Sequence, residues 1–410
     1  MRAVALLDLV ALFVVARVFG ELCQRVRVPA LVGEILAGVI LGPLVLAFVL
    51  PGGAIKLVAD LGVFFLVYAA GMEMTFRGVR RTIKENAAAV AAGSFSLPFL
   101  LGFLVGLAFG FEARTSLFLG LALSLTALPV SVRILSDLGW LGTDVGQTII
   151  TAGLLCDIAG LTVLAAIAGW TPAVGLSPLA TTVVALKIVL FFLTVFSVER
   201  LLRAKGGAVS RWIAGASERL LSRGAAFSVP IILVFAFALF AEFLGLHFVV
   251  GTFFGSVILA EHVFPQREGG RLRDSISAIS DGFLAPLFFA YLGLIAVAFT
   301  LSIAPLFVVL LMTAVAGKVG GSYLGARLSG YGTWSSSVVA VGMNGRGAME
   351  LVIALVGLEL GIIAGPVFSL LVLLGLVTTL MTPFILRRLA RFPTSEAAPP
   401  AAAGDVPPAS

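Results

Sequence analysis

Long apolar runs separated by short polar gaps make up most of the chain. A bilayer core takes about 20 apolar residues per helix, and windows of this kind recur along the sequence. We predict thirteen membrane-spanning helices, at residues 3–22, 28–43, 55–72, 87–109, 115–136, 145–169, 179–199, 227–244, 247–262, 280–299, 303–326, 335–359 and 363–386. The pattern therefore predicts an all-α polytopic membrane protein embedded in a lipid bilayer.

The composition agrees with this class. Of the 410 residues, 60% are hydrophobic and 12% are charged, whereas a soluble domain has about 25% charged residues. Two cysteines cannot form a disulfide framework, and two histidines leave little for histidine-based metal chemistry. The net charge of +6 does not indicate nucleic-acid binding, because the basic residues lie in short gaps between apolar runs.

The basic residues predict an orientation. Of the 27 lysines and arginines, nineteen lie after odd-numbered spans or beyond the last span, two lie at the N-terminus or after even-numbered spans, and six lie within the predicted spans. Cytoplasmic loops are the ones enriched in Lys and Arg. We expect a multi-pass protein of the cell membrane with its N-terminus outside and its C-terminus in the cytoplasm.

A basic segment in the middle predicts a chain of two halves. Residues 1–199 form the first half with spans one to seven, and residues 227–388 form the second half with spans eight to thirteen. Residues 200–226 mix basic with large apolar residues, which predicts an amphipathic linker on the cytoplasmic face. Residues 389–410 are rich in Pro and Ala and are predicted to be disordered.

Two spans carry signals of a helix break. Span five is predicted to break near residues 124–132, where Pro129 removes an amide donor, and span twelve near residues 342–347, where three glycines surround Asn344. The two spans are seven apart and therefore run in opposite directions, as inverted repeats with crossed discontinuous helices require. The alternative is an ordinary proline kink and a glycine-rich packing face.

Charged residues at membrane depth are candidates for function. Asp157 lies in the middle of span six and suits cation or proton binding, the alternative being a neutral acid bonded to a backbone carbonyl. Lys318 lies in the middle of span eleven as a titrating amine or a fixed counter-charge to Asp157. Arg346 and Glu350 lie four residues apart, so they form either a local ion pair or, with the amide of Asn344, a supporting motif for transport.

Three motifs resemble one transporter family. They are PALVGEILAGVILGP at residues 29–43, LGVFFLVYAAGME at residues 61–73 and GMNGRGAME at residues 342–350. Together they resemble the monovalent cation:proton antiporter-2 family of sodium/proton and potassium/proton exchangers, over nearly the whole chain up to about Arg388.

The resemblance implies a thirteen-helix homodimer in which a core domain moves like an elevator against a fixed dimerisation domain. On the same basis Asp157 matches the residue that binds the cation and the proton, and would be the metal ligand for Na⁺ or K⁺. Thr126 matches the polar residue at the first break, and Lys318 the lysine of the core domain. Arg346 and Glu350 match the charged motif after the second break, and no cofactor is implied.

One residue of the site departs from the family pattern. Electrogenic members carry two adjacent aspartates, and Cys156 stands in place of the first. A thiol buried among apolar groups stays protonated, so the site keeps one carboxylate and one amine. We therefore expect electroneutral exchange of one proton per cation, carried by Lys318 or by Asp157. Both Na⁺ and K⁺ fit this chemistry.

Three other functions compete with exchange. A sodium-coupled carrier for organic anions would use Lys318 to meet a carboxylate, although Asp157 would repel the anion unless a sodium ion covered it. A channel would move ions without proton countermovement, and the sequence has no TVGYG-like filter. A membrane enzyme would need a nucleophile/base pair or a metal cluster, and neither is visible. The interpretation is a transporter and not an enzyme.

Overall fold

The computed structural model describes residues 2–26, 28–72, 87–126, 131–132, 135, 138, 140, 143–169, 178–204, 225–262, 266–298 and 301–390. All regular elements within these ranges are helices, which confirms the predicted all-α class. The amphipathic linker is described only at its ends, because α9 continues to Ala204 and α11 begins at Ala225. Residue 129 of the first break and residues 391–410 of the tail also lie outside the described ranges.

The elements follow one another in a simple order. They are α1 (Arg2–Arg25), α2 (Ala30–Leu41), α3 (Gly53–Met72), α5 (Ala87–Ala108), α6 (Ala113–Ser124), α8 (Asp144–Gly169), α9 (Pro178–Ala204), α11 (Ala225–Phe243), α12 (Phe248–His262), α13 (Gln266–Ile279), the π-helix η2 (Ser280–Leu284), α14 (Ala285–Ile295), the 3₁₀-helix η3 (Leu301–Ile303), α15 (Ala304–Leu328), α16 (Thr333–Met343), α17 (Ala348–Glu359) and α18 (Gly365–Ala390). Within the described residues, each predicted span overlaps a helix or consecutive helices of this order.

Length and composition single out the strongest membrane spans. Among the described residues, six helices are long and apolar enough to cross a bilayer, and the bent pair α16–α17 would make a seventh. Shorter apolar helices, α2, α6, α11 and α12, occupy four more predicted windows. These helices make the chain a polytopic membrane protein, while the count of thirteen spans stays a prediction.

Span ten begins earlier than predicted. The sequence placed Arg273 in a polar gap before a span at 280–299, yet α13, η2 and α14 form one uninterrupted helical stretch from Gln266 to Ile295. Polar side chains do not end a helix by themselves, and here the helical stretch continues through the π-helix η2 and past Pro286 at the start of α14. The hydropathy pattern marked where the helix becomes apolar and missed where it starts.

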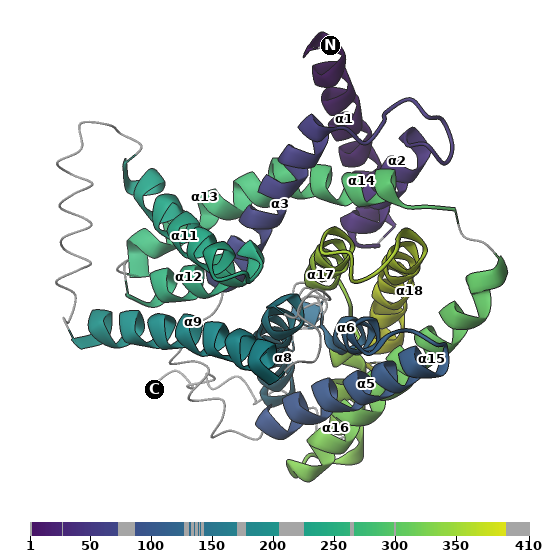
Figure 1. Cartoon of the computed structure of the whole chain (residues 1–410). Helices are drawn as coiled ribbons and strands as arrows, with labels where there is room; N and C mark the ends of the chain where they lie inside the picture. The colour runs from purple at the N-terminus through teal and green to yellow at the C-terminus, as the bar shows by residue number, and fades with distance from the viewer. Residues whose placement is uncertain are drawn as a thin grey trace, which may run out of the picture.

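The helices form two groups that are visible in Figure 1. The first contains α1, α2, α3 and α11 to α14, in which α2 packs on α1 and α14 while α3 packs on α12 and α14. The second contains α5, α6, α8 and α15 to α18, in which α5 packs on α15, α6 and α8. Residues of the second half of the chain therefore complete both groups. Helix α9 contacts α8 of the second group and α12 of the first, so it bridges the two.

Close backbone contact joins the two halves inside the second group. Gly93 of α5 and Gly321 of α15 face each other, and a Cβ on either one would overlap the carbonyl oxygen of the other. Small residues let helices approach in membranes, where packing drives helix association. The pair fixes α15, which carries Lys318, against α5.

Candidate functional site

The first predicted break is a real end of a helix. Helix α6 stops at Ser124, and Leu125 takes an extended conformation with φ −74° and ψ 160°. Thr126 follows it outside any helix and is 2% exposed. The last carbonyls of α6 therefore have no partner within their own helix and need donors from elsewhere.

The second break lies where the glycine-rich segment predicted it. Helix α16 ends at Met343, α17 begins at Ala348, and the two axes are bent by 43°. Asn344, at the end of α16, is 2% exposed, and its Oδ1 has no hydrogen-bond partner among the described residues. A free amide oxygen is thus buried at membrane depth within this break.

Hydrogen bonds connect each break to the other. Ser131, after the first break, donates through Oγ to the carbonyl oxygen of Gly342 at 2.7 Å. Arg346, within the second break, donates to the carbonyl oxygens of Ala122 at 2.9 Å and Leu123 at 2.5 Å, both in the last turn of α6. The two interrupted helices thus meet at their breaks, as expected for crossed discontinuous helices.

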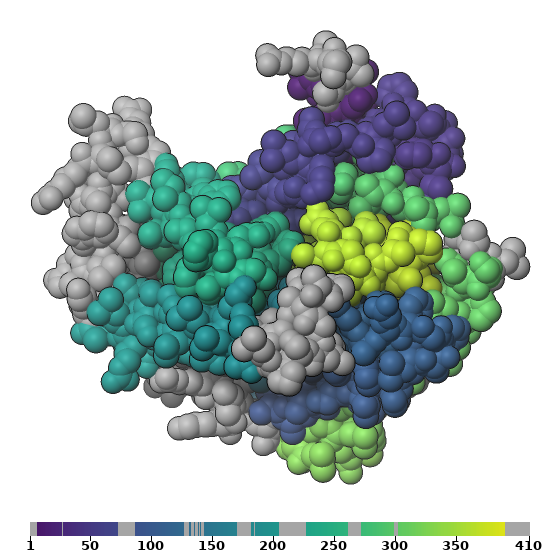
Figure 2. Space-filling view, in the orientation of Figure 1, coloured from purple at the N-terminus to yellow at the C-terminus, as the bar shows by residue number. Residues whose placement is uncertain are grey.

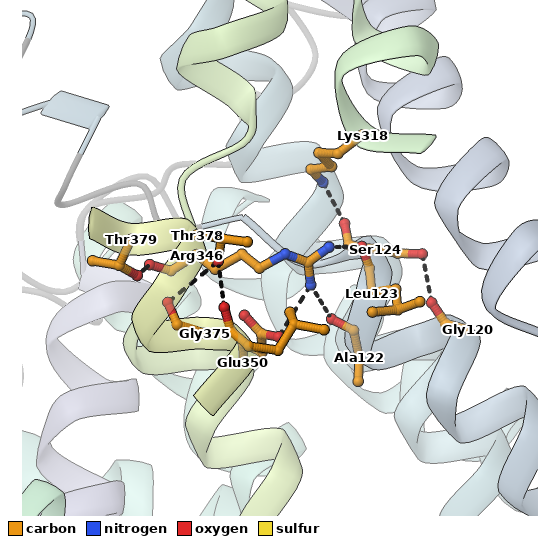
Figure 3. Close-up of polar contacts among 11 residues, drawn as sticks. Gly120, Ala122, Leu123, Ser124, Lys318, Arg346, Glu350, Gly375, Thr378 and Thr379 are labelled. Carbon is orange, nitrogen blue, oxygen red and sulfur yellow. Dashed lines mark hydrogen bonds and ion pairs between the residues drawn. The ribbon is translucent and has the colours of Figure 1, made fainter. Parts of the chain in front are cut away.

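Two cationic side chains cover the end of α6. Lys318 Nζ donates a hydrogen bond to the carbonyl oxygen of Ser124, and the guanidinium of Arg346 lies beside it (Figure 3). Both Lys318 and Arg346 are fully buried. A helix C-terminus carries a partial negative charge, and each cation near it contributes about 0.3–1 kcal/mol, or up to ~2 kcal/mol when partly buried. The three open carbonyls explain why two positive charges are tolerated at this depth.

The pair of Arg346 and Glu350 is more than a local ion pair. Arg346 Nη1 lies 3.0 Å from Glu350 Oε1, and Glu350 is 1% exposed. Glu350 stands in the first turn of α17, where the positive helix end favours an acid. The predicted local ion pair is therefore present, and through Arg346 it is also tied to the carbonyls at the end of α6.

Asp157 lies between the two breaks on α8. Gly160, one turn further along α8, faces Leu125 of the first break closely enough that a Cβ would lie 2.5 Å from Leu125 Cδ2. Two turns before Asp157, Ile149 faces Gly342 of the second break, where a Cβ on Gly342 would lie 2.6 Å from Ile149 Cδ1. Asp157 is 3% exposed. Its position therefore brings its carboxylate to the region where the interrupted helices meet.

The predicted charged residues share one electrostatic environment. The amine of Lys318 interacts with the charges of Asp157, Arg346 and Glu350, and with Cys156. Cys156 is fully buried on α8, and its thiol points to the carbonyl oxygen of Ala91 on α5 at 3.7 Å. The structure thus brings together the residues that the sequence analysis singled out.

Two further residues hold the site and were missed in the sequence. Thr379 of α18 donates through Oγ1 to the carbonyl oxygen of Arg346, and Ser131 bonds Gly342 as described above. The threonines Thr378, Thr379 and Thr382 lie within about one and a half turns in the apolar part of α18 and are all fully buried. That polar run at membrane depth was the available signal for Thr379.

Oxygen atoms are what this region offers to a cation. Among the described residues, no group of three or more His, Cys, Asp or Glu is arranged so that it could hold a metal ion. The hydroxyl of Thr126 is buried and lies within hydrogen-bond reach of the Cys156 thiol. The amide oxygen of Asn344 is buried and has no hydrogen-bond partner among the described residues. Carboxylate, hydroxyl and carbonyl oxygens suit hard cations.

Comparison with known families decides what kind of protein this is. Residues 9–392 match the family described as sodium/hydrogen exchanger, transmembrane. The chain belongs to this family. The three sequence motifs that indicated a monovalent cation:proton antiporter are thereby confirmed, and the chain is a multi-pass member of the exchanger family.

Similar exchangers are found in bacteria. A protein named probable Na⁺/H⁺ antiporter GerT from Bacillus cereus is 28% identical over 383 residues, which cover 93% of this chain and 98% of GerT. The Na⁺/H⁺-K⁺ antiporter GerN from the same organism is 29% identical over 373 residues, covering 90% of this chain and 92% of GerN. The likeness extends over nearly the full length of both relatives.

A solved structure supports the exchanger fold. The sodium proton antiporter MjNhaP1 from Methanocaldococcus jannaschii superimposes with a TM-score of 0.65 at 16% identity, covering 96% of this chain and 98% of MjNhaP1. At this identity the likeness concerns the fold alone. The arrangement of helices in Figure 1 is therefore an exchanger fold.

Proposed function

We propose that this exchanger moves Na⁺ or K⁺ against H⁺ at a site centred on Asp157. The observation that carries the proposal is the position of Asp157, buried on α8 between Leu125 of the first break and Gly342 of the second. A carboxylate in a low-dielectric interior is stable when protonated or when it faces a cation. Alternation between these two states is proton exchange.

The neighbouring oxygens complete the proposed cation site. Thr126 and Asn344 each supply a buried oxygen, one at each break. The hydroxyl of Thr126 lies beside the Cys156 thiol, and the amide oxygen of Asn344 has no hydrogen-bond partner among the described residues. Asp157 would provide the charge, and these two would provide neutral ligands. Na⁺ or K⁺ would thus be substrate, held only while the site is closed to one side.

The charge balance of the site supports a ratio of one to one. Cys156 contributes no charge as a neutral thiol, so Asp157 is the acidic group of α8 at this depth. Lys318 stays near Asp157 while it caps Ser124, and either Lys318 or Asp157 can give up the proton as the cation enters. One proton leaves per cation, so exchange is electroneutral.

The two helix groups provide the moving parts of the proposal. The second group holds Asp157, Lys318 and both breaks and would move as a body against the first group, carrying the cation across. The first group would form the contact of a homodimer in the cell membrane, with the N-terminus outside and the C-terminus in the cytoplasm, as the basic residues predict.

Proton movement in proteoliposomes tests the function. Vesicles with an acidic interior receive Na⁺, K⁺ or Li⁺ outside, and an internal dye follows the pH. We expect collapse of the gradient with Na⁺ or K⁺, and none after Asp157→Asn. Asp144→Asn is the matched control, because Asp144 is exposed at the start of the same helix. Collapse that persists in Asp157→Asn would refute the proposed site.

A further inference from the structure

A cluster of charged residues joins the two helix groups away from the cation site. Lys56 Nζ lies 2.6 Å from Glu359 Oε1 and 3.3 Å from Asp60 Oδ2. His247 Nε2 lies 3.7 Å from Glu359 Oε2. We call these four residues the Lys56 cluster. Lys56 and Asp60 lie on α3 and His247 directly precedes α12, both in the first group, whereas Glu359 ends α17 of the second.

The cluster lies at one end of the helix bundle. Next to it in the chain, Ile362 accepts a hydrogen bond from Thr115 at the start of α6, at 2.8 Å. The site is further along the helices, since Arg346 lies at the other end of α17 from Glu359 and Ser124 at the other end of α6 from Thr115. On the face seen in Figure 2, the yellow surface of the C-terminal helices directly borders the purple surface of the N-terminal quarter of the chain.

Lys56 and Glu359 each stand at the helix end that disfavours their charge. Lys56 stands in the first turn of α3, and Glu359 is the last residue of α17. A helix disfavours a cation at its N-terminus and an anion at its C-terminus. Neither helix end therefore favours the charge it carries. Lys56 has Asp60 as a partner on α3, whereas both partners of Glu359, Lys56 and His247, lie across the boundary between the two groups.

The cluster is shielded enough for these contacts to have an effect. The side chain of Glu359 is 23% exposed and that of His247 is 8% exposed, while Lys56 keeps 45%. Tyr291 of α14 also interacts electrostatically with Lys56, Asp60 and Glu359. Glu359 is thus the one member from the second group, and it is surrounded by residues of the first.

We infer that the Lys56 cluster is an ionic latch that holds the two helix groups together in this conformation and opens when the second group moves. The inference rests on the proposed function, because it assigns the latch to the movement that exposes the cation site to the two sides in turn. Glu359 and Lys56 are then positioning residues. They set the balance between the two access states and leave the chemistry at Asp157 unchanged.

Distance measurements between the groups test the latch without any transport. Spin labels are placed at Leu57 on α3 and at Phe109 after α5, which are 63% and 43% exposed, in a chain with Cys23→Ser and Cys156→Ser. Pulsed electron paramagnetic resonance in lipid nanodiscs then gives the populations of the two arrangements. We expect Glu359→Gln to shift their ratio about threefold away from the present arrangement, as a partly exposed ion pair allows.

Arg114→Gln is the matched control for this shift. Arg114 is a basic residue at the same end of the bundle, and it bonds the carbonyl oxygen of Ile167 at 3.4 Å within the second group. Its loss should leave the ratio of the two populations unchanged. An equal ratio in Glu359→Gln and in the unsubstituted labelled protein would overturn the latch.

Cross-linking tests whether the latch has to open. Lys56→Cys with Glu359→Cys is joined by a bifunctional thiol reagent about as long as the two original side chains, and proton movement is followed in proteoliposomes. We expect exchange to stop and to return on reduction. Lys56→Cys with Asp60→Cys, both on α3, is the control in which cross-linking leaves exchange intact.

The two proposals fail in different ways. Exchange that continues at full rate in the cross-linked Lys56–Glu359 pair would overturn the latch and leave the antiport proposal standing. Absence of cation-dependent proton movement in the unsubstituted protein would refute the antiport proposal. The ratio of the two populations, measured from the spin-label distances, would still decide about the latch.

Discussion

Ser131 and Gly342 lie 211 positions apart in the chain and share a hydrogen bond of 2.7 Å. The hydroxyl of Ser131 follows the first helix break and the carbonyl of Gly342 precedes the second, so this bond ties the two halves together where their helices are interrupted. It also satisfies a carbonyl that a break would otherwise leave without a donor. Arg346 makes the reciprocal connection back to α6.

Ser131→Ala should therefore destabilise the protein. A buried carbonyl left without its donor costs about 1–3 kcal/mol, so we expect a lower midpoint of thermal unfolding and slower exchange. Ser337→Ala is the control, because Ser337 makes the same kind of bond to Thr333 at an exposed position. Equal unfolding midpoints for the two variants would contradict the structural role of Ser131.

Arg346 and Glu350 should show strong coupling. Arg346→Gln leaves Glu350 buried without its ion pair and leaves two carbonyls of α6 without a donor. We therefore expect the free energy of unfolding to fall by about 3–5 kcal/mol. The double variant with Glu350→Gln should be less destabilised than the sum of the two single variants. A double-mutant cycle from chemical unfolding in detergent measures this coupling, and simple additivity would mean that the pair contributes nothing of its own.

Cys156→Asp should change the stoichiometry. A second carboxylate beside Asp157 provides another group that can exchange a proton, so we expect two protons per cation and a rate that responds to membrane voltage. The measurement is the rate of proton movement under potassium-diffusion potentials of both signs, with Na⁺ as the transported ion. Cys156→Ser is the neutral control and should stay insensitive to voltage. A voltage-driven rate in the unsubstituted protein would contradict the proposed ratio of one to one.

Two adjacent glycines of α15 should respond in opposite directions. Gly321→Ala places a Cβ against the carbonyl of Gly93, and overpacking of this kind costs about 1–3 kcal/mol. Gly320→Ala meets only Leu97 Cδ2 at 3.7 Å, an ordinary contact, and replaces a residue that weakens helices by about 1 kcal/mol. Thermal unfolding in detergent should therefore fall for Gly321→Ala and rise for Gly320→Ala. A fall of the same size in both would argue against the close approach at Gly93.

Much of the fold follows from local properties of the sequence. Apolar length identified each helix window, and the glycines around Asn344 marked a break that the structure places directly after Met343. A hydropathy pattern identifies an apolar helix, but it does not show whether a neighbouring polar segment continues that helix. The start of α13 was missed for this reason, because its polar residues gave no membrane signal although the helix runs on into α14.

The candidate site was predicted by residue type more completely than by contact. Asp157 and Lys318 were recognisable because a charge at membrane depth needs an explanation. The partner of Lys318, the carbonyl of Ser124, could not be recognised, because every residue has a carbonyl. This one lacks a donor within its own helix only because α6 ends there. The contact between Lys56 and Glu359 was equally hidden, because 303 positions separate them and each alone resembles an ordinary charge at a helix end.

The capping of α6 has a consequence for biosynthesis. The three carbonyls at its end belong to residues 122–124, while the side chains that bond them belong to residues 318 and 346. A ribosome adds about 5–20 residues per second and domains form from the N-terminus onward, so α6 enters the membrane many seconds before its donors exist. Until the second half of the chain is made, the newly inserted α6 must keep its end hydrated or in contact with the insertion machinery, and a chain truncated before Lys318 would never complete it.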